Sequence, residues 1–191
     1  MDVIQATREF IGTIHADDAS GHDVAHITRV VRLVERLMED EPVNRTVLLL
    51  SAYLHDVEDH KLGRPNGLVK QHLSSIDITE EQVDLVMTVI DEVSFSKGKM
   101  PTTRESEILQ DADRLDAMGA IGIARTFQFA GSRGTPLDLS EDSAIQHFQD
   151  KLLMLASMMH TAKAKQLAMS RHAFMQQFLE QFHEEWDGVD I

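Results

Sequence analysis

Apolar residues recur at intervals of three and four along most of this chain. Between Val24 and Glu39 they fall at positions 27, 30, 31, 34, 37 and 38, which together form one face of an α-helix. The segment from Glu80 to Val93 repeats the spacing, and Thr79 followed by Glu81 and Gln82 is typical of a helix start. No segment shows sustained alternation of apolar and polar residues, so strands are not required. The pattern predicts an all-α fold.

The same periodicity predicts further helices over residues 43–57, 105–118, 121–129, 140–169 and 172–186. All four prolines lie in stretches that look like loops, as a helical protein requires. Residues 130–138 contain two glycines and a proline and are the expected linker. We therefore expect one domain, with a helical core over residues 1–130 and a C-terminal helical extension over 131–191 packed on it. The apolar stripe of the extension favours this packing over a dimer interface, and both monomer and homodimer stay open.

Composition excludes several classes of protein. The chain has no cysteine, so disulfides, iron–sulfur sites and thiol nucleophiles are ruled out. Its net charge is −14 and its basic residues are scattered, which argues against nucleic acid as a partner. The first ten residues do not resemble a secretory signal, and the densest apolar run, 47–54, is too short to span a bilayer. We expect a cytoplasmic protein with no membrane partner.

The adjacent pair His55 and Asp56 ends a nearly continuous apolar run, VLLLSAYLHD. A helix this apolar is expected to be buried, and burying a carboxylate without a partner costs several kcal/mol. A bound metal ion removes that cost, because imidazole and carboxylate are suitable ligands for divalent Mn, Fe, Co, Ni or Zn. The alternative is that the pair forms a polar end to the helix beside a loop.

Two further clusters favour the metal site. In GHDVAH, His22 and His26 are four residues apart and share a helix face if the helix already includes His22. In DADRLDA, Asp113 and Asp116 are three residues apart and project to one side of a helix. A helix N-cap with a solvated charged face explains either cluster alone. Three such clusters on three apolar helices fit that explanation less well.

The ordered set of these residues resembles the HD-domain superfamily of metal-dependent phosphohydrolases. The segments GHDVAHITRV, LHDVEDHK, SFSKG, QDADRLDAMGAIGIAR and HFQDKLLML are similar to a subfamily of small bacterial HD hydrolases. The resemblance implies an all-helical HD domain in which His26, His55, Asp56 and Asp113 bind a metal. It also implies that Asp116 supports these ligands without binding the metal itself. Asp111 is expected at a helix start or in solvent.

The resemblance further implies a single divalent ion, taken from Mn, Mg, Fe, Co, Ni and Zn, with Mn favoured. Some relatives bind a second metal through extra histidines between the HD pair and the last aspartate. Here that interval holds only His60 and His72. Glu92 and Val93 stand where some relatives carry a histidine before SFS, so any role of that histidine is lost or altered.

An acid or base must handle the proton during hydrolysis. Asp59 follows His55 by four residues, one helical turn, and is the expected general acid/base, with Glu58 the lesser candidate. Lys61, Arg29 and His22 are the candidates to bind substrate phosphate. For each of these three a plain surface role is an equally good alternative.

The expected reaction is hydrolysis of a phosphoester or phosphoanhydride in a small phosphorylated substrate, expected to be a nucleotide. Conversion of a nucleoside triphosphate to monophosphate and pyrophosphate is favoured. The rival from another class is a catalytically silent HD module that binds a nucleotide as a regulator. A metalloprotease, suggested by the His22–His26 spacing, is disfavoured because Asp23 replaces the longer glutamate base of HExxH.

Overall fold

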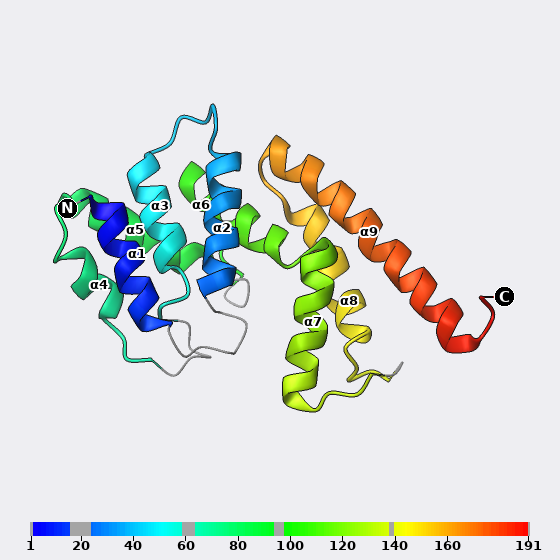
Figure 1. Ribbon diagram of the computed structural model, residues 1–191. Helices are drawn as coiled ribbons and strands as arrows, with labels where there is room; N and C mark the ends of the chain where they lie inside the picture. The colour runs from blue at the N-terminus through cyan, green and yellow to red at the C-terminus, as the bar shows by residue number, and fades with distance from the viewer. Residues whose placement is uncertain (1, 16–23, 59–63, 94–97, 138–139, 191) are drawn as a thin grey trace. The chain divides into compact units, whose positions relative to one another are not determined.

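The structure is a computed structural model that describes residues 2–15, 24–58, 64–93, 98–137 and 140–190 (Figure 1). Throughout these ranges the regular elements are helices, and no strand occurs, so the all-α prediction is confirmed. The chain divides into two compact units, Met1–Asp113 and Arg114–Ile191. None of the described helices has the length and apolar character needed to cross a membrane.

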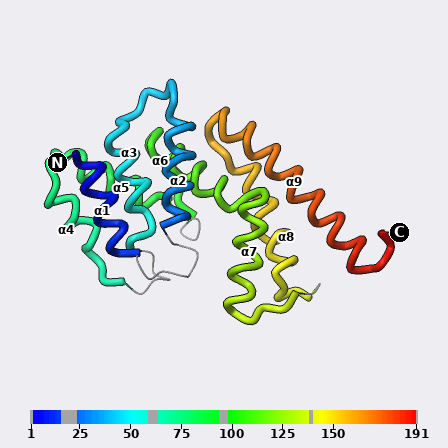
Figure 2. The backbone as a smooth tube through the Cα atoms, in the orientation of Figure 1, coloured from blue at the N-terminus to red at the C-terminus, as the bar shows by residue number. Residues whose placement is uncertain are grey.

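Helix α3 (Arg45–Leu54) is the centre of the N-terminal unit. Helices α1 (Val3–Ile14), α2 (Val24–Leu37) and α5 (Glu80–Val93) all pack against it, and α3 lies between α1 and α2 (Figures 1 and 2). Because neighbours surround α3, its sequence is apolar on nearly every side rather than on one stripe. Its fully buried apolar residues are Val47, Leu48, Leu50, Ala52 and Leu54.

Side chains fix where these helices begin. Asn44 Oδ1 accepts a hydrogen bond from Val47 N at 3.2 Å and caps α3. Before α5, Thr79 Oγ1 accepts from Gln82 N at 3.2 Å, and Gln82 Oε1 accepts from Thr79 N at 3.1 Å. This reciprocal pair is a capping box, which satisfies two backbone donors that the helix itself leaves unpaired. The start predicted at Thr79 is confirmed.

Helices α6 (Arg104–Asp116) and α7 (Gly119–Arg133) follow one another across a tight turn. A Cβ atom on Gly122 would lie 2.2 Å from the carbonyl oxygen of Ala117, so only glycine allows this approach. Both helices were predicted, but α7 runs four residues beyond its expected end at 129. It stops at Gly134, whose φ of 67° ends the helix, so the expected linker begins later than predicted.

The prediction of one long helix over residues 140–169 is wrong. This region contains α8 (Gln146–Asp150), a 3₁₀ helix (Leu152–Met158) and the start of α9 (Ala162–Asp187). Thr161 Oγ1 accepts a hydrogen bond from Ala164 N at 3.2 Å and starts α9 as a new helix. The break expected between residues 169 and 172 does not occur. Helices α1 and α4 (Leu68–Leu73) were not predicted.

The C-terminal unit is built around α9, against which α7 and the 3₁₀ helix pack. Three phenylalanines from α7, α8 and α9 form its aromatic centre. The ring centroid of Phe178 lies 5.8 Å from that of Phe127 and 5.9 Å from that of Phe148, distances at which aromatic rings attract one another. This unit therefore has a core of its own.

His72 links α4 to α1 in the N-terminal unit. Its ring stacks on Phe10 with centroids 4.3 Å apart, and its Nε2 lies 2.9 Å from Thr7 Oγ1. The Thr7 hydroxyl already donates to the carbonyl of Val3, so it accepts from the Nε2–H of His72. Burial lowers the pKa of His72. The neutral ring is therefore the form that the folded chain favours.

We expect His72 to make the fold less stable as the medium becomes acidic. The unfolded chain, with a pKa near 6.5, binds a proton more readily than the folded chain, so the stabilisation is complete above about pH 6.5 and is lost below it. His72→Gln should flatten the slope of unfolding free energy against pH by up to about 1.4 kcal/mol per unit. Urea unfolding of EDTA-treated protein between pH 5 and 7.5 measures the slope. Identical slopes for both proteins would contradict this expectation.

Candidate metal centre

Two helices bring the histidines of the site together. His26 lies in the first turn of α2 on its buried face, and His55 is the residue that ends α3. Asp56 follows directly, and all three side chains are buried. Their ligand atoms lie within 4.8 Å of one another, as a shared metal ion requires. The predicted cluster of His26, His55 and Asp56 thus exists in the folded chain.

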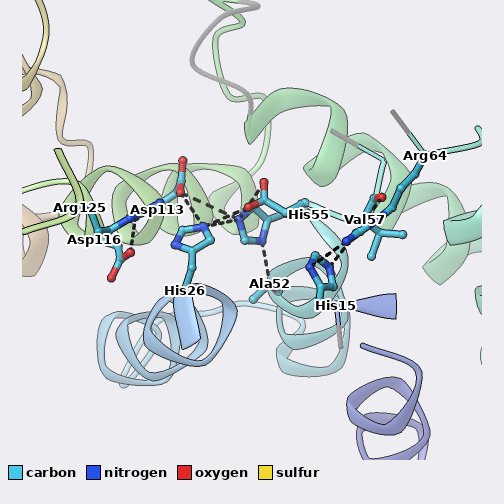
Figure 3. Close-up of polar contacts among 10 residues, drawn as sticks. His15, His26, Ala52, His55, Val57, Arg64, Asp113, Asp116 and Arg125 are labelled. Carbon is cyan, nitrogen blue, oxygen red and sulfur yellow. Dashed lines mark hydrogen bonds and ion pairs between the residues drawn. The ribbon is translucent and has the colours of Figure 1, made fainter. Parts of the chain in front are cut away.

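Asp56 lies against the imidazoles of His26 and His55, two rings that Figure 3 shows close together. Its Oδ2 is 3.2 Å from Nε2 of His26, and its Oδ1 is 3.5 Å from Nε2 of His55. Asp113, on α6, completes the group, with Oδ1 at 3.6 Å from His26 Nε2 and 4.0 Å from His55 Nε2. The fourth predicted ligand is therefore beside the other three.

The donor set fits a divalent ion. Two imidazole nitrogens that bind one ion at about 2.1 Å, with an angle of about 90–109° between them, lie about 3.0–3.4 Å apart. The Nε2 atoms of His26 and His55 are 3.3 Å apart. His55 Nδ1 lies 2.9 Å from the carbonyl of Ala52, and a hydrogen bond donated there leaves Nε2 with its lone pair toward the cluster.

The four clustered side chains differ in their exposure to solvent. The side chains of His26 and His55 are each 2% exposed, and that of Asp56 is 9% exposed. The side chain of Asp113 is 32% exposed. Asp113 is therefore the member of the cluster most accessible to solvent. A catalytic metal site needs such an accessible side.

Asp116 lies one helical turn after Asp113 on α6 and is not among the clustered ligands. It is buried, and its Oδ2 accepts a hydrogen bond from Arg125 Nη1 at 2.5 Å. Its predicted supporting role stays a prediction. Arg29 is half-buried on α2, one turn after His26.

The expectation that Asp111 lies at a helix start or in solvent is wrong. Asp111 is completely buried in the middle of α6. The helix begins earlier, where Thr103 Oγ1 accepts from Ser106 N at 3.0 Å, so Asp111 shares the inner face with Ile108 and Leu115.

Most of the predicted catalytic and substrate-binding residues lie outside the part of the chain that the structure describes. Asp59, Lys61 and His22 lie outside them, as does His60. Glu58 Oε1 accepts a hydrogen bond from Val69 N at 2.8 Å and so holds the first turn of α4. Helix α3 ends at Leu54, so residues 55–58 do not continue it, and the predicted position of Asp59 stays a prediction.

No pattern in the sequence indicated a role for Arg64 near the cluster. Its Nη1 donates to the carbonyl of Val57 at 3.4 Å and lies 3.0 Å from Nε2 of His15, while its Nη2 lies 3.2 Å from Nδ1 of the same ring (Figure 3). His15 ends α1 and is buried. Arg64 thus ties the end of α1 to the residue after Asp56. The two partners are 49 residues apart, and no spacing in the sequence indicates the contact.

We expect Arg64→Ala to weaken metal binding about tenfold, because residues that orient metal ligands typically have effects of this size. Titration calorimetry with Mn²⁺ measures the affinity. Lys70→Ala is the matched control, since Lys70 is an exposed cation on nearby α4. Equal affinities for the two variants would show that Arg64 does not position the HD pair.

The regular elements of the described residues are all helices, and the histidine–aspartate cluster fits a metal site. The HD domain family matches residues 23–118, a range that holds all four clustered residues. The chain belongs to the HD domain family.

Individual relatives resemble the chain over nearly its whole length. YpgQ of Bacillus subtilis strain 168 is 40% identical, over 96% of this chain and 93% of that protein. A crystal structure of B. subtilis YpgQ in complex with ADP has a TM-score of 0.83 and 35% identity, covering 98% of this chain and 100% of that one. An HD-superfamily hydrolase from Bacillus thuringiensis has a TM-score of 0.79 and 40% identity, covering 96% of both chains.

Proposed function

We propose that this chain is a metal-dependent phosphohydrolase that acts on nucleotides and favours nucleoside triphosphates. The observation that supports this most directly is the convergence of two imidazoles and two carboxylates around one point beside an exposed side. The HD-superfamily hydrolase from B. thuringiensis and the ADP complex of YpgQ agree with a hydrolase and with a nucleotide ligand.

His26, His55, Asp56 and Asp113 would hold one divalent ion, with Mn²⁺ favoured. When bound, such an ion supplies Lewis acidity toward a phosphoryl oxygen and lowers the pKa of water. His72 contacts Thr7 and Phe10 and lies outside the cluster, which supports a single ion over a pair. Asp59 is proposed to accept the proton of the attacking water. Lys61, Arg29 and His22 are proposed to bind the phosphate groups of the substrate.

In the favoured reaction the water oxygen bonds to the α-phosphorus, and the bond from that phosphorus to the bridging oxygen breaks. Pyrophosphate leaves with the bridging oxygen, and the proton removed from water can return to it. The product pair is a nucleoside monophosphate and pyrophosphate. A phosphatase acting at the terminal phosphate would instead release orthophosphate.

A panel of nucleoside triphosphates, diphosphates and monophosphates, incubated with the Mn²⁺-loaded protein, tests this proposal. We expect pyrophosphate and monophosphate in equal amounts from triphosphates, identified by ³¹P NMR. Orthophosphate as the first product would overturn the favoured cleavage but retain a phosphohydrolase. If nucleotides bind and none is hydrolysed, the chain is instead a regulatory HD module.

A further inference from the structure

A groove lies between α1 and α2, away from the metal centre. Both helices pack against α3, which lies between them (Figure 2). Tyr53 of α3 lines the groove. Its volume is about 460 Å³, within the range of about 300–1,000 Å³ that small-molecule sites occupy. Ile27 and Val31 of α2 are buried and give it an apolar lining.

The groove and the metal centre lie on opposite sides of the same two helices. On α2, Glu35 lines the groove and is nine residues after His26, about two and a half turns, so the two side chains leave opposite faces. On α3, Tyr53 is two residues before His55 and is also directed away from it. Occupying the groove therefore does not require the metal or its substrate.

The charged residues of the groove have both signs. Arg8 and Arg32 line it together with Glu9 and Glu35, so two positive side chains face two negative ones and their formal charges cancel. Among the described residues, Arg8, Arg32 and Glu35 form no ion pair with one another or with any other side chain. Opposite charges that share a groove without pairing are available to a ligand.

Two of these charged side chains, Arg8 and Glu35, influence the same hydroxyl group, that of Tyr53. Burial raises the pKa of the Tyr53 hydroxyl, Arg8 opposes that rise, and Glu35 adds to it. A guanidinium and a carboxylate thus both lie close enough to influence one hydroxyl beside an apolar wall. A nucleotide phosphate would meet the carboxylates as well as the arginines, whereas a molecule with a carboxylate and an ammonium group satisfies both signs.

We propose that this groove binds a zwitterionic ligand of the amino-acid type, with an apolar side chain. Its carboxylate would contact Arg8 and Arg32, its ammonium group Glu35, and its side chain Ile27 and Val31. A free apolar amino acid and an apolar dipeptide share this chemistry, and the volume of the groove accommodates either. This site is separate from the proposed hydrolase site.

Titration calorimetry on the full chain with L-leucine and L-leucyl-L-leucine tests the proposal and separates the two sources. We expect saturable binding of at least one of them in the millimolar range or tighter. The corresponding N-acetyl and amide derivatives, which each lack one charge, should bind at least about tenfold more weakly, because a charged hydrogen bond contributes about 1.5–3 kcal/mol.

Variants locate the site. Arg32→Gln and Glu35→Gln should each weaken binding at least about tenfold. Arg36→Gln should not, since Arg36 is an exposed arginine on the same helix that does not line the groove. The proposal is overturned if neither zwitterion binds, if the blocked derivatives bind equally well, or if the groove variants bind like Arg36→Gln.

Discussion

Asp56→Ala is expected to abolish metal binding and turnover. Asp56 is the one ligand whose two oxygens face different imidazoles, at 3.2 Å from His26 and 3.5 Å from His55. Removing it leaves two buried imidazoles and the more exposed Asp113, a set with a single carboxylate to offset the charge of a divalent ion. We expect the Mn²⁺ affinity to fall more than about 100-fold, since even residues outside the ligand set change it by about 10–100-fold.

Calorimetry and elemental analysis of untagged protein measure the bound metal, and circular dichroism verifies that the variant remains helical. Asp84→Ala is the matched control, because Asp84 is an exposed aspartate on α5, away from the cluster. A variant that lacks Asp56 and retains full metal content would show that the cluster is not the metal site. Loss of metal from the Asp84 variant would point instead to general destabilisation.

Helices were predictable where periodicity and capping residues agree. The α5 segment satisfies both, with four buried residues on one face and a capping box at Thr79. The region after residue 140 shows the limit. Its apolar residues keep a helical spacing through a 3₁₀ helix and into α9, and only the cap at Thr161 separates them. The periodicity of apolar residues indicates which residues are buried, but it does not indicate where a helix ends.

The apolar setting of the three polar clusters favoured a metal site, because a polar group there needs a partner. The resemblance to HD-domain proteins, rather than that setting, implied which four residues form the ligand set. Asp111 has the same setting, and the sequence did not distinguish it from a solvent-facing carboxylate. The contact of Arg64 with His15 had no sequence signal, because it depends on how α1 meets the turn after α3. Sequence patterns thus indicate which residue types bind metal, while the residues that orient them depend on packing between distant segments.

Asp59→Asn is expected to retain the metal and to slow turnover about 10²–10⁴-fold, the usual contribution of a general acid or base. Asparagine preserves the size of the side chain and cannot accept a proton from water. The initial rate of triphosphate hydrolysis at saturating Mn²⁺ measures the effect. An unchanged rate would show that Asp59 is not the acid/base.

Glu58→Gln separates the two candidates. The Glu58 carboxylate accepts a hydrogen bond from Val69 N at 2.8 Å, and the glutamine amide oxygen can accept the same bond. The variant should therefore retain its fold and turn over within a few-fold of the wild-type rate. If Glu58→Gln instead loses activity while Asp59→Asn retains it, the proton passes through Glu58. Its Oε2 could then accept the proton while Oε1 keeps the bond from Val69 N.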